Sequence, residues 1–416
     1  MVFEDLGIDG RLMKTLKERG FIEPTDIQRI CIPEIKAGRD VFGQSSTGSG
    51  KTLAFALPIL EKLVHGNGIQ ALVLTPTREL CLQVAGVFSD FGLPLGIKTA
   101  TVYGGVDINP QIDALRHADV VVGTPGRVID HLERKTIFFG NVRYLVLDEA
   151  DKMFEMGFIE DVEYIIGFVP KERQTLLFSA TITSQVHEVM NKHLKTPEVL
   201  TARTLVDAKL LKQVYYDIYN QNEKFSLLTH LLKTETSGFC MIFCATRNEV
   251  DAIAENLKRY GVNATAIHGG HAQNKRERSL DALKTGEISV LVATDVAARG
   301  LDIKNISHIY NYDVPKTDDE YIHRIGRTAR AGESGTAVTL LTKRDHDNFR
   351  KVLANPKLNV EKASMPQFPL LSFYRGYGRH SGGFGGGGRF GSHRGRPGGG
   401  RFHGRGGHSY HRRSGR

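Results

Sequence analysis

The feature that most constrains the fold is an alternation of short apolar runs with longer amphipathic stretches, which occurs twice along the chain. The first series of runs comprises residues 70–76, 98–105, 118–125, 144–151 and 174–181. The second comprises residues 212–219, 238–246, 264–270, 289–295, 307–313 and 335–342. An intervening stretch such as 246–261 begins with Thr, has helical spacing and closes with Gly. Repeated strand–helix alternation predicts parallel α/β sheets.

The two series predict two domains, and 416 residues suffice for a sizeable core in each. The stretch 197–211 is typical of a polar segment without a strand, so we place the boundary there. We expect one α/β domain over residues 1–204, a linker over 205–209 and a second α/β domain over 210–364. Residues 365–416 form a Gly-rich and Arg-rich tail that cannot bury a core, and we expect it to be disordered.

The basic excess of the chain is concentrated in this tail. Residues 372–416 contain ten Arg, no Lys and no acid, whereas residues 1–371 contain 45 basic and 46 acidic residues. The tail therefore carries +10 and the remainder −1. Arg interleaved with Phe, Tyr and His predicts contacts to RNA phosphates and unpaired bases. The alternative is a tail that serves only solubility; a metal site of its five irregularly spaced His is less favoured.

Composition excludes several other classes of protein. The first ten residues lack the regions of a signal peptide, and no apolar run approaches the length of a membrane span. The four Cys form no C-x-x-C pair, and Cys240 and Cys244 fall on one face of a strand. They are typical of small apolar residues in a reduced compartment. We expect a cytoplasmic protein that is not bound to a membrane.

An acidic cluster follows one of the buried runs. The apolar residues 144–147 are followed by Asp148, Glu149 and Asp151. The carboxyl ends of parallel strands are where open α/β sheets bind ligands, and clustered carboxylates repel one another unless a cation lies near them. The cluster therefore predicts a metal ion next to a phosphate.

A matching phosphate site lies in residues 45–52, "SSTGSGKT". Backbone N–H groups of such a loop and the following helix N-terminus bind phosphate oxygens. Lys51 would reach the terminal phosphates and Thr52 would bind Mg²⁺. Ser45 stands where the usual pattern has its first Gly, and a chance Gly/Ser loop is the alternative. The downstream acids favour the nucleotide site, with Asp148 on the metal and Glu149 on the attacking water.

With these motifs in place, the chain resembles the DEAD-box RNA helicases, whose name-giving tetrad is residues 148–151. The resemblance covers residues 1–350 in order. It includes the Q motif at 20–28 with Phe3 upstream, "PTREL" at 76–80, "GG" at 104–105, "TPGR" at 124–127 and "SAT" at 179–181. In the second half it includes residues 241–244, 273–276, 293–303 and 323–330. The resemblance implies two tandem RecA-like domains and ATP with Mg²⁺ as substrate.

The resemblance also implies roles for the nucleotide residues. Gln28 would read the adenine edge with Thr25 nearby, Phe21 would stack on the ring, and Asp302 would contact the ribose. The remaining loop residues are Ser46, Thr47, Gly48, Ser49 and Gly50. Arg327 and Arg330 would reach the γ-phosphate from the second domain. Ser179, Thr181, Asp151 and His323 would couple the acidic motif to domain closure; without the resemblance, Phe21 and His323 would be interpreted as structural residues.

The RNA residues implied by the resemblance are small, hydroxyl-bearing, amide or cationic. They are Thr77, Arg78, Gly104, Gly105, Thr124, Gly126 and Arg127 in the first domain, and Gln273, Arg276 and Thr294 in the second. Such groups bind phosphate and sugar rather than bases, which predicts binding that does not depend on sequence. One departure is Gly270, where the family usually carries Asp after His-Gly.

These observations favour an RNA-stimulated ATPase that separates short duplexes, with a core that we expect to be monomeric. An ATP-gated RNA clamp with slow hydrolysis uses the same motifs and stays open as an alternative. A DNA translocase is disfavoured by the Q motif and by the complete set of motifs.

Overall fold

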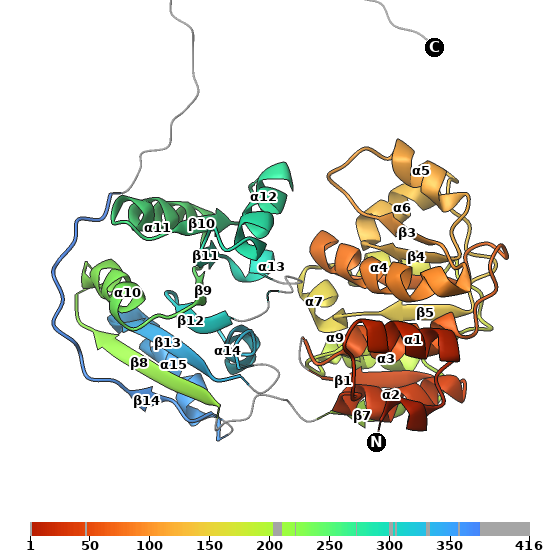
Figure 1. The fold of residues 1–416 in the computed structure, drawn as a ribbon, viewed down its shortest axis with the longest axis horizontal. Coiled ribbons are helices and arrows are strands. Elements are labelled where there is room, and N and C mark those ends of the chain that lie inside the picture. The colour runs from red at the N-terminus through yellow and green to blue at the C-terminus, as the bar shows by residue number, and fades with distance from the viewer. Residues whose placement is uncertain are drawn as a thin grey trace, which may run out of the picture. The chain divides into compact units, whose positions relative to one another are not determined.

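The computed structural model describes residues 2–45, 48–202, 210–220, 222–271, 273–298, 303, 306–329, 333–356 and 358–374. It contains two seven-stranded sheets, and every strand pair within them is parallel. The predicted fold class is confirmed (Figure 1). Among the described residues, no helix combines the length and apolar character needed to cross a membrane.

The first sheet has the strand order β3-β4-β2-β5-β6-β1-β7. Its strands are β1 (Val41–Gln44), β2 (Ala71–Leu74), β3 (Thr99–Val102), β4 (Val120–Gly123), β5 (Tyr144–Leu147), β6 (Gln174–Ser179) and β7 (Glu198–Thr201). Its helices are η1 (Phe3–Leu6), α1 (Gly10–Glu18), α2 (Asp26–Lys36), α3 (Lys51–Leu60), α4 (Arg78–Gly92), η2 (Leu93–Leu95), α5 (Asn109–Leu115), α6 (Pro125–Glu133), α7 (Ala150–Glu155), α8 (Ile159–Ile166) and α9 (Ser184–His193).

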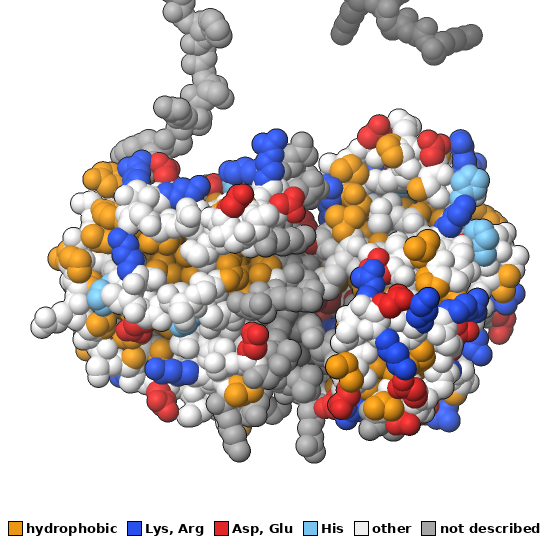
Figure 2. All heavy atoms as spheres, viewed as in Figure 1, with side chains coloured by type: hydrophobic (Ala, Val, Ile, Leu, Met, Phe, Trp, Pro, Cys, Tyr) orange, Lys and Arg blue, Asp and Glu red, His pale blue; other side chains and the backbone are white. Residues whose placement is uncertain are grey.

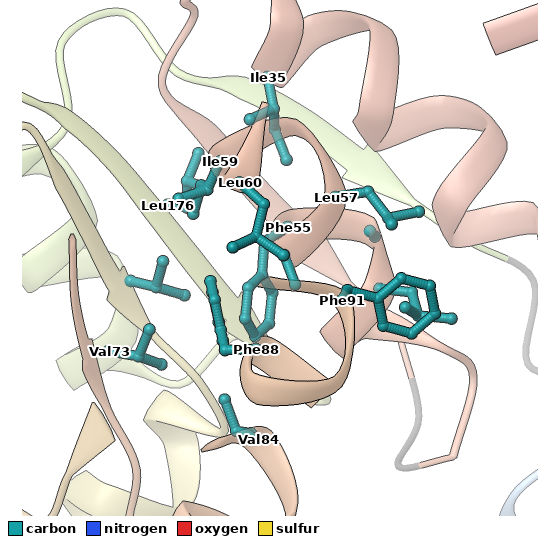
Figure 3. Packing of buried hydrophobic residues seen from close by; sticks show 14 of the residues in the cluster. Ile35, Phe55, Leu57, Ile59, Leu60, Val73, Val84, Phe88, Phe91 and Leu176 are labelled. Carbon is teal, nitrogen blue, oxygen red and sulfur yellow. The ribbon is translucent and has the colours of Figure 1, made fainter. Parts of the chain in front are cut away.

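Side chains of the first sheet alternate between two cores, as expected for a sheet covered on both faces. On β2, Val73 packs with α1 to α4, whereas Leu72 and Leu74 pack with α6 to α9. Figure 3 shows part of the first core, where Phe55 lies against Phe88 with ring centroids 6.1 Å apart. Because both faces are buried, the strands are continuous apolar runs, and this is why they are recognisable in the sequence.

The second sheet has the order β10-β11-β9-β12-β13-β8-β14. Its strands are β8 (Leu211–Ile218), β9 (Phe239–Phe243), β10 (Ala264–Ile267), β11 (Val290–Ala293), β12 (Ile306–Asn311), β13 (Gly335–Thr342) and β14 (Glu361–Lys362). Its helices are α10 (Glu223–Thr234), α11 (Arg247–Arg259), α12 (Gln273–Lys284), α13 (Asp295–Ala298), α14 (Asp318–Ile325), η3 (Lys343–Asp345) and α15 (His346–Ala354). Cys240 and Cys244 belong to one buried cluster, on the face that α10 and α11 cover, as their spacing predicts.

Two strands of the first sheet differ from the sequence-based expectation. Residues 197–211 were expected to hold no strand, but β7 lies within them and pairs with β1. Its side chains are alternately half-buried and exposed, so it lacks an apolar run. The strand β1, between β6 and the edge strand β7, was not among the predicted strands; it includes Gly43, where a Cβ would lie 2.4 Å from the Phe178 ring. The expected linker, 205–209, lies outside the described residues.

The C-terminal strap, residues 365–374, packs on the second domain although the sequence assigned it to the tail. The Leu371 amide donates to Ser226 Oγ at 2.9 Å, and Asn256 pairs with both backbone groups of Tyr374 at 2.8 and 2.9 Å. Phe373 lies 5.0 Å from Phe225 between ring centroids. The expected start of the tail at residue 365 is therefore too early, because these residues bury apolar side chains. Residues 375–416 lie outside the described part of the chain.

Candidate functional site

The loop expected to bind phosphate leads directly into α3. Gly50 has φ 93° and ψ 15°, a left-handed conformation that glycine adopts without strain. The Lys51 ammonium donates to the Ser45 carbonyl at 3.0 Å, and the hydroxyls of Ser45 and Ser49 lie 2.8 Å apart. Thr52 follows in the first turn of α3. The result is a lysine held across a loop whose helix N-terminus favours anions.

Gln28 joins this loop to the Q motif. Its side chain is on α2 and is 2% exposed. Gln28 Oε1 accepts from the Thr25 amide at 2.9 Å, and its Nε2 donates to the Gly50 carbonyl at 3.0 Å. A Cβ at Gly50 would lie 2.5 Å from Gln28 Nε2. The contact therefore requires glycine, a constraint that loop chemistry alone does not indicate.

Phe21 is placed differently from a core aromatic residue. It is 40% exposed, and its ring centroid lies 6.3 Å from that of Phe91. Phe21 is therefore not a fully buried core residue, and part of its side chain is open to solvent.

The acidic cluster begins where β5 ends. Asp148 is 2% exposed and accepts from the Glu149 amide at 3.0 Å. Burial raises the pKa of Asp148 to about 6, against the opposing effect of Lys51. Glu149 adopts φ 50° and ψ 49°, a left-handed conformation that is uncommon for a residue with a side chain. Such strain is found where a functional side chain must be placed in a set direction.

Asp151 is on α7 and is hydrogen-bonded to the segment that follows β6, the strand beside β5. Its Oδ2 accepts from the Thr181 amide at 3.2 Å and from the Thr181 hydroxyl at 2.9 Å. Ser179 Oγ donates to the Thr181 carbonyl at 2.7 Å. Burial opposes ionisation, but Lys152 and the Thr181 hydrogen bond contribute to holding the pKa of Asp151 below its usual value. The acidic motif and the 179–181 motif thus form one hydrogen-bonded unit.

Two candidates from α14 and the turn after it join this acidic region. Burial and then Lys152 lower the pKa of His323 to about 3, although Asp151 acts in the opposite direction. The imidazole is therefore neutral at physiological pH. His323 and Arg327 line one pocket with Glu149 and Lys152.

The first-domain candidates for RNA contact lie at helix starts and strand ends. Thr77 caps α4 by accepting from the Leu80 amide at 3.3 Å, and the Arg78 guanidinium lies 4.4 Å from the Tyr103 ring centroid. Arg127 donates to the Val106 carbonyl at 3.1 Å. The remaining positions are Gly104 and Gly105 after β3, and Thr124 and Gly126 at the start of α6.

One groove collects several of these candidates. It is lined by Thr77, Arg78, Gly104 and Gly105, with Arg276, Gly269 and His271 of the second domain. Arg276 Nη2 lies 2.9 Å from a carboxylate oxygen of Glu79. Thr294 directly follows β11, and Gln273 begins α12. The candidates Ser46, Thr47, Asp302 and Arg330 lie outside the described residues.

Sequence reasoning missed a buried ion pair that supports the Arg327 segment. Arg324 donates to both oxygens of Asp295 at 2.6 and 2.7 Å and to Asn311 Oδ1 at 3.2 Å. This bidentate pair joins α14 to α13. Arg324 lies within residues 323–330, but its partner is 29 residues away in the sequence, and no local pattern joins them.

Comparison with known proteins agrees with this geometry. A family model described as DEAD/DEAH box helicase matches residues 25–189, and one described as helicase conserved C-terminal domain matches residues 223–332. The DEAD-box ATP-dependent RNA helicase CshA of Geobacillus kaustophilus is 43% identical over 366 residues, which is 88% of this chain and 78% of the relative. The ATP-dependent RNA helicase CshA of Limosilactobacillus reuteri is 42% identical over 354 residues, covering 85% and 71%.

Solved structures show the same fold. Dbp5 of S. cerevisiae bound to RNA and ADP BeF3 aligns with a TM-score of 0.79 and 32% identity, over 87% of this chain and 95% of that one. Mss116p bound to ssRNA and AMP-PNP aligns with a TM-score of 0.77 and 28% identity, over 87% and 78%. The prediction of two tandem RecA-like domains is confirmed.

Proposed function

Because the chain belongs to the DEAD-box family of ATP-dependent RNA helicases, we propose that it binds RNA without sequence preference and separates short duplexes locally. ATP hydrolysis stimulated by RNA drives turnover. The observation that carries the proposal is the unit formed by Lys51, the acidic cluster and Thr181. The positive charge of Lys51 acts to lower the pKa of both Asp148 and Asp151, and Asp151 accepts a hydrogen bond from the Thr181 hydroxyl.

The proposed recognition of adenine follows from the donor and the acceptor of the Gln28 side chain that the protein leaves unused. A carboxamide has two N–H donors and two acceptor lone pairs. The protein uses one donor for Gly50 and one lone pair for Thr25. One donor and one acceptor remain, which is the complement of adenine N7 and its 6-amino group. Guanine presents two acceptors at these positions, so the proposed nucleotide is ATP, with Phe21 stacking on the base.

The residues at the strand end suit a divalent cation. Asp148 is buried and its pKa is raised toward 6, so a nearby Mg²⁺ would favour the ionised carboxylate. Asp148 and the Thr52 hydroxyl would hold the ion, which when bound would neutralise phosphate charge. Glu149, held in its left-handed conformation, would orient the attacking water.

Closure of the second domain on the first would complete the site. Arg327 and Arg330 would stabilise the charge that develops on the γ-phosphate, so hydrolysis would depend on closure. Asp302 would contact the ribose. Neutral His323, with Asp151, Ser179 and Thr181, would link closure to the acidic motif. Closure on RNA would bend one strand, which a duplex cannot follow.

RNA would lie along the groove of small and cationic groups. Thr77, Arg78 and the glycine pair 104–105 would bind phosphate and sugar, together with Thr124, Gly126 and Arg127. Gln273, Arg276 and Thr294 would contribute from the second domain. Figure 2 shows Lys and Arg side chains interspersed with Asp and Glu on the face in view, in accord with a body that binds RNA by shape more than by net charge. The cationic tail would tether RNA.

A strand-separation assay tests the proposal. A short RNA duplex with a single-stranded overhang should be separated in the presence of ATP, and separation should stop in the variant Glu149→Gln. A stable complex with RNA and ATP, but with neither separation nor turnover, would identify the ATP-gated clamp instead. Activity that a DNA-only substrate supports equally well would identify a DNA translocase.

A further inference from the structure

A cluster of two histidines and one carboxylate lies in the second domain, away from the nucleotide residues. Asp251 is on α11, His268 follows β10, and His271 lies just before α12. One potential ligand atom from each of these side chains lies within 4.8 Å of the other two. Two imidazoles and one carboxylate form a donor set that Zn²⁺ and similar transition metals prefer.

The loop between the histidines brings the two rings together. The ring centroids of His268 and His271 are 3.7 Å apart. Between them, a Cβ at Gly270 would lie 3.1 Å from His268 Nδ1 and 3.2 Å from its Cε1. Because Gly270 has no side chain, the loop folds back here without crowding the His268 ring.

The donor atoms are close to the spacing that a tetrahedral ion requires. His268 Nε2 lies 2.8 Å from Asp251 Oδ2, and His271 Nε2 lies 3.1 Å from Asp251 Oδ1. Ligands about 2.0–2.1 Å from a tetrahedral Zn²⁺ are separated by about 3.3 Å. The two histidine–carboxylate distances would therefore lengthen by about 0.5 and 0.2 Å, and the two histidine donor atoms lie within 4.8 Å of each other.

The Nε2 atom of His271 cannot form a hydrogen bond with both of its polar neighbours at once. It lies 3.1 Å from Asp251 Oδ1, which only accepts, and 2.9 Å from Lys275 Nζ, which only donates. If Nε2 carries a proton, it cannot accept a hydrogen bond from the Lys275 ammonium. If it carries no proton, it cannot donate one to the Asp251 carboxylate. The Nδ1 atom of His271 is buried and has no hydrogen-bond partner among the described residues. A metal ion bound to His271 Nε2 and Asp251 Oδ1 would satisfy both lone pairs, and the nearby ammonium of Lys275 would oppose it.

The surroundings allow an ion to enter and bind. The His271 side chain is 7% exposed and that of His268 is 6%, whereas the Asp251 side chain is 51% exposed and open to solvent. Lys275 is exposed and can move away.

One rearrangement is required at His268. Its Nδ1 accepts from the Gly270 amide at 3.1 Å, so its proton resides on Nε2. Binding of an ion at Nε2 moves this proton to Nδ1, and the Gly270 N–H must turn away from it. Gly269 and Gly270 give the backbone this freedom. The exchange leaves the number of protons on the ring unchanged.

We propose that Asp251, His268 and His271 form a binding site for a divalent transition metal ion of the Zn²⁺ type. The inference does not depend on the proposed function, because it concerns residues outside the nucleotide site. His271 also lines the groove that contains Arg276, so an ion bound here would fix the start of α12 beside that groove.

The test is a Zn²⁺ titration of the full-length protein against a chromophoric chelator, repeated with Co²⁺ followed by its visible absorption. Any metal binding by the five histidines of the tail is the same in every variant, so only the differences in binding between variants report on the proposed site. His271→Ala and Asp251→Asn should each lose the same single ion or bind it at least about 10-fold more weakly. His117→Ala, which changes an exposed histidine of the first domain, should match the unchanged protein.

Lys275→Ala provides a further criterion, because it removes the competing ammonium. It should strengthen binding of that ion, which a purely structural role of the histidine pair does not predict. Equal stoichiometry and affinity in the unchanged protein, His271→Ala and Asp251→Asn would overturn the proposed site. No gain in Lys275→Ala would overturn the assignment of the lysine as a competitor of the ion.

Discussion

The replacement Gln28→Met tests how the protein selects its nucleotide. Methionine has a similar length and shape but offers no comparable hydrogen-bonding groups, so packing around α2 is retained. The change removes the bonds of Gln28 to the Thr25 amide and the Gly50 carbonyl, which measure 2.9 and 3.0 Å. It also removes the remaining donor and acceptor that we assign to adenine.

The expected magnitude follows from these four bonds. Each neutral hydrogen bond contributes about 1 kcal/mol net. Loss of the two protein bonds should lower the free energy of unfolding by about 2 kcal/mol, since the group is 2% exposed and its partners stay buried. Loss of the two bonds to adenine should weaken the binding of ATP by a similar free energy, which corresponds to about 30-fold in affinity. The affinity for GTP should fall much less.

Fluorescent ATP and GTP analogues, titrated with the protein in the absence of RNA, measure this effect. Gln111→Met is a matched control, because Gln111 is also buried in the first domain and bonds to the Tyr103 carbonyl at 3.0 Å and to His131 at 3.3 Å. It should lose comparable stability and keep its nucleotide affinity. If Gln28→Met retains the ATP-to-GTP affinity ratio of the unchanged protein, Gln28 does not read the base.

Three further predictions concern catalysis, pH dependence and the tail. Glu149→Gln should bind ATP and RNA but hydrolyse ATP about 10²-fold more slowly, measured as phosphate release; near-normal turnover would refute its role. Burial, with Asp313 beside it, raises the pKa of Glu249 to about 7, so the folded state should lose stability as pH rises from about 4.5 to about 7. Glu249→Gln should abolish that loss, about 1–2 kcal/mol after allowance for solvent screening, in urea unfolding at pH 5 and pH 8; an unchanged pH dependence would contradict the assignment. Ending the chain after Arg375 removes nine of the ten tail arginines. If half of these contact RNA, the slope of log affinity against log salt should flatten by about three, while ATPase at saturating RNA persists; an unchanged slope would show that the tail does not bind RNA.

The sequence predicted most of the strands that are buried on both faces, together with the polar segments that follow them. Residues 144–147 are a continuous apolar run because the strand lies inside the sheet, and the acids after it stand out. By contrast, β7 is partly exposed and β1 contains Gly43 against Phe178. Neither strand carries the pattern on which such predictions depend.

Other features depend on contacts between distant residues. The C-terminal strap resembles a tail because it contains Pro366 and Pro369, yet Leu371 and Phe373 pack on the second domain. The pairing of Arg324 with Asp295 joins two motifs that a linear reading keeps apart. Likewise, the position of Gln28 in the sequence gives no sign that it bonds to Gly50. In each case, the partner is distant in the sequence, and only the fold identifies it.

The central claim is that RNA completes the ATPase site through arginines of the second domain. The most direct measurement is the steady-state ATPase rate of the full-length protein with and without single-stranded RNA, for the unchanged chain and for Arg330→Ala. RNA should strongly stimulate the unchanged chain, and Arg330→Ala should lose that stimulation with nearly unchanged ATP affinity. An ATPase that is equally fast with and without RNA would contradict this claim.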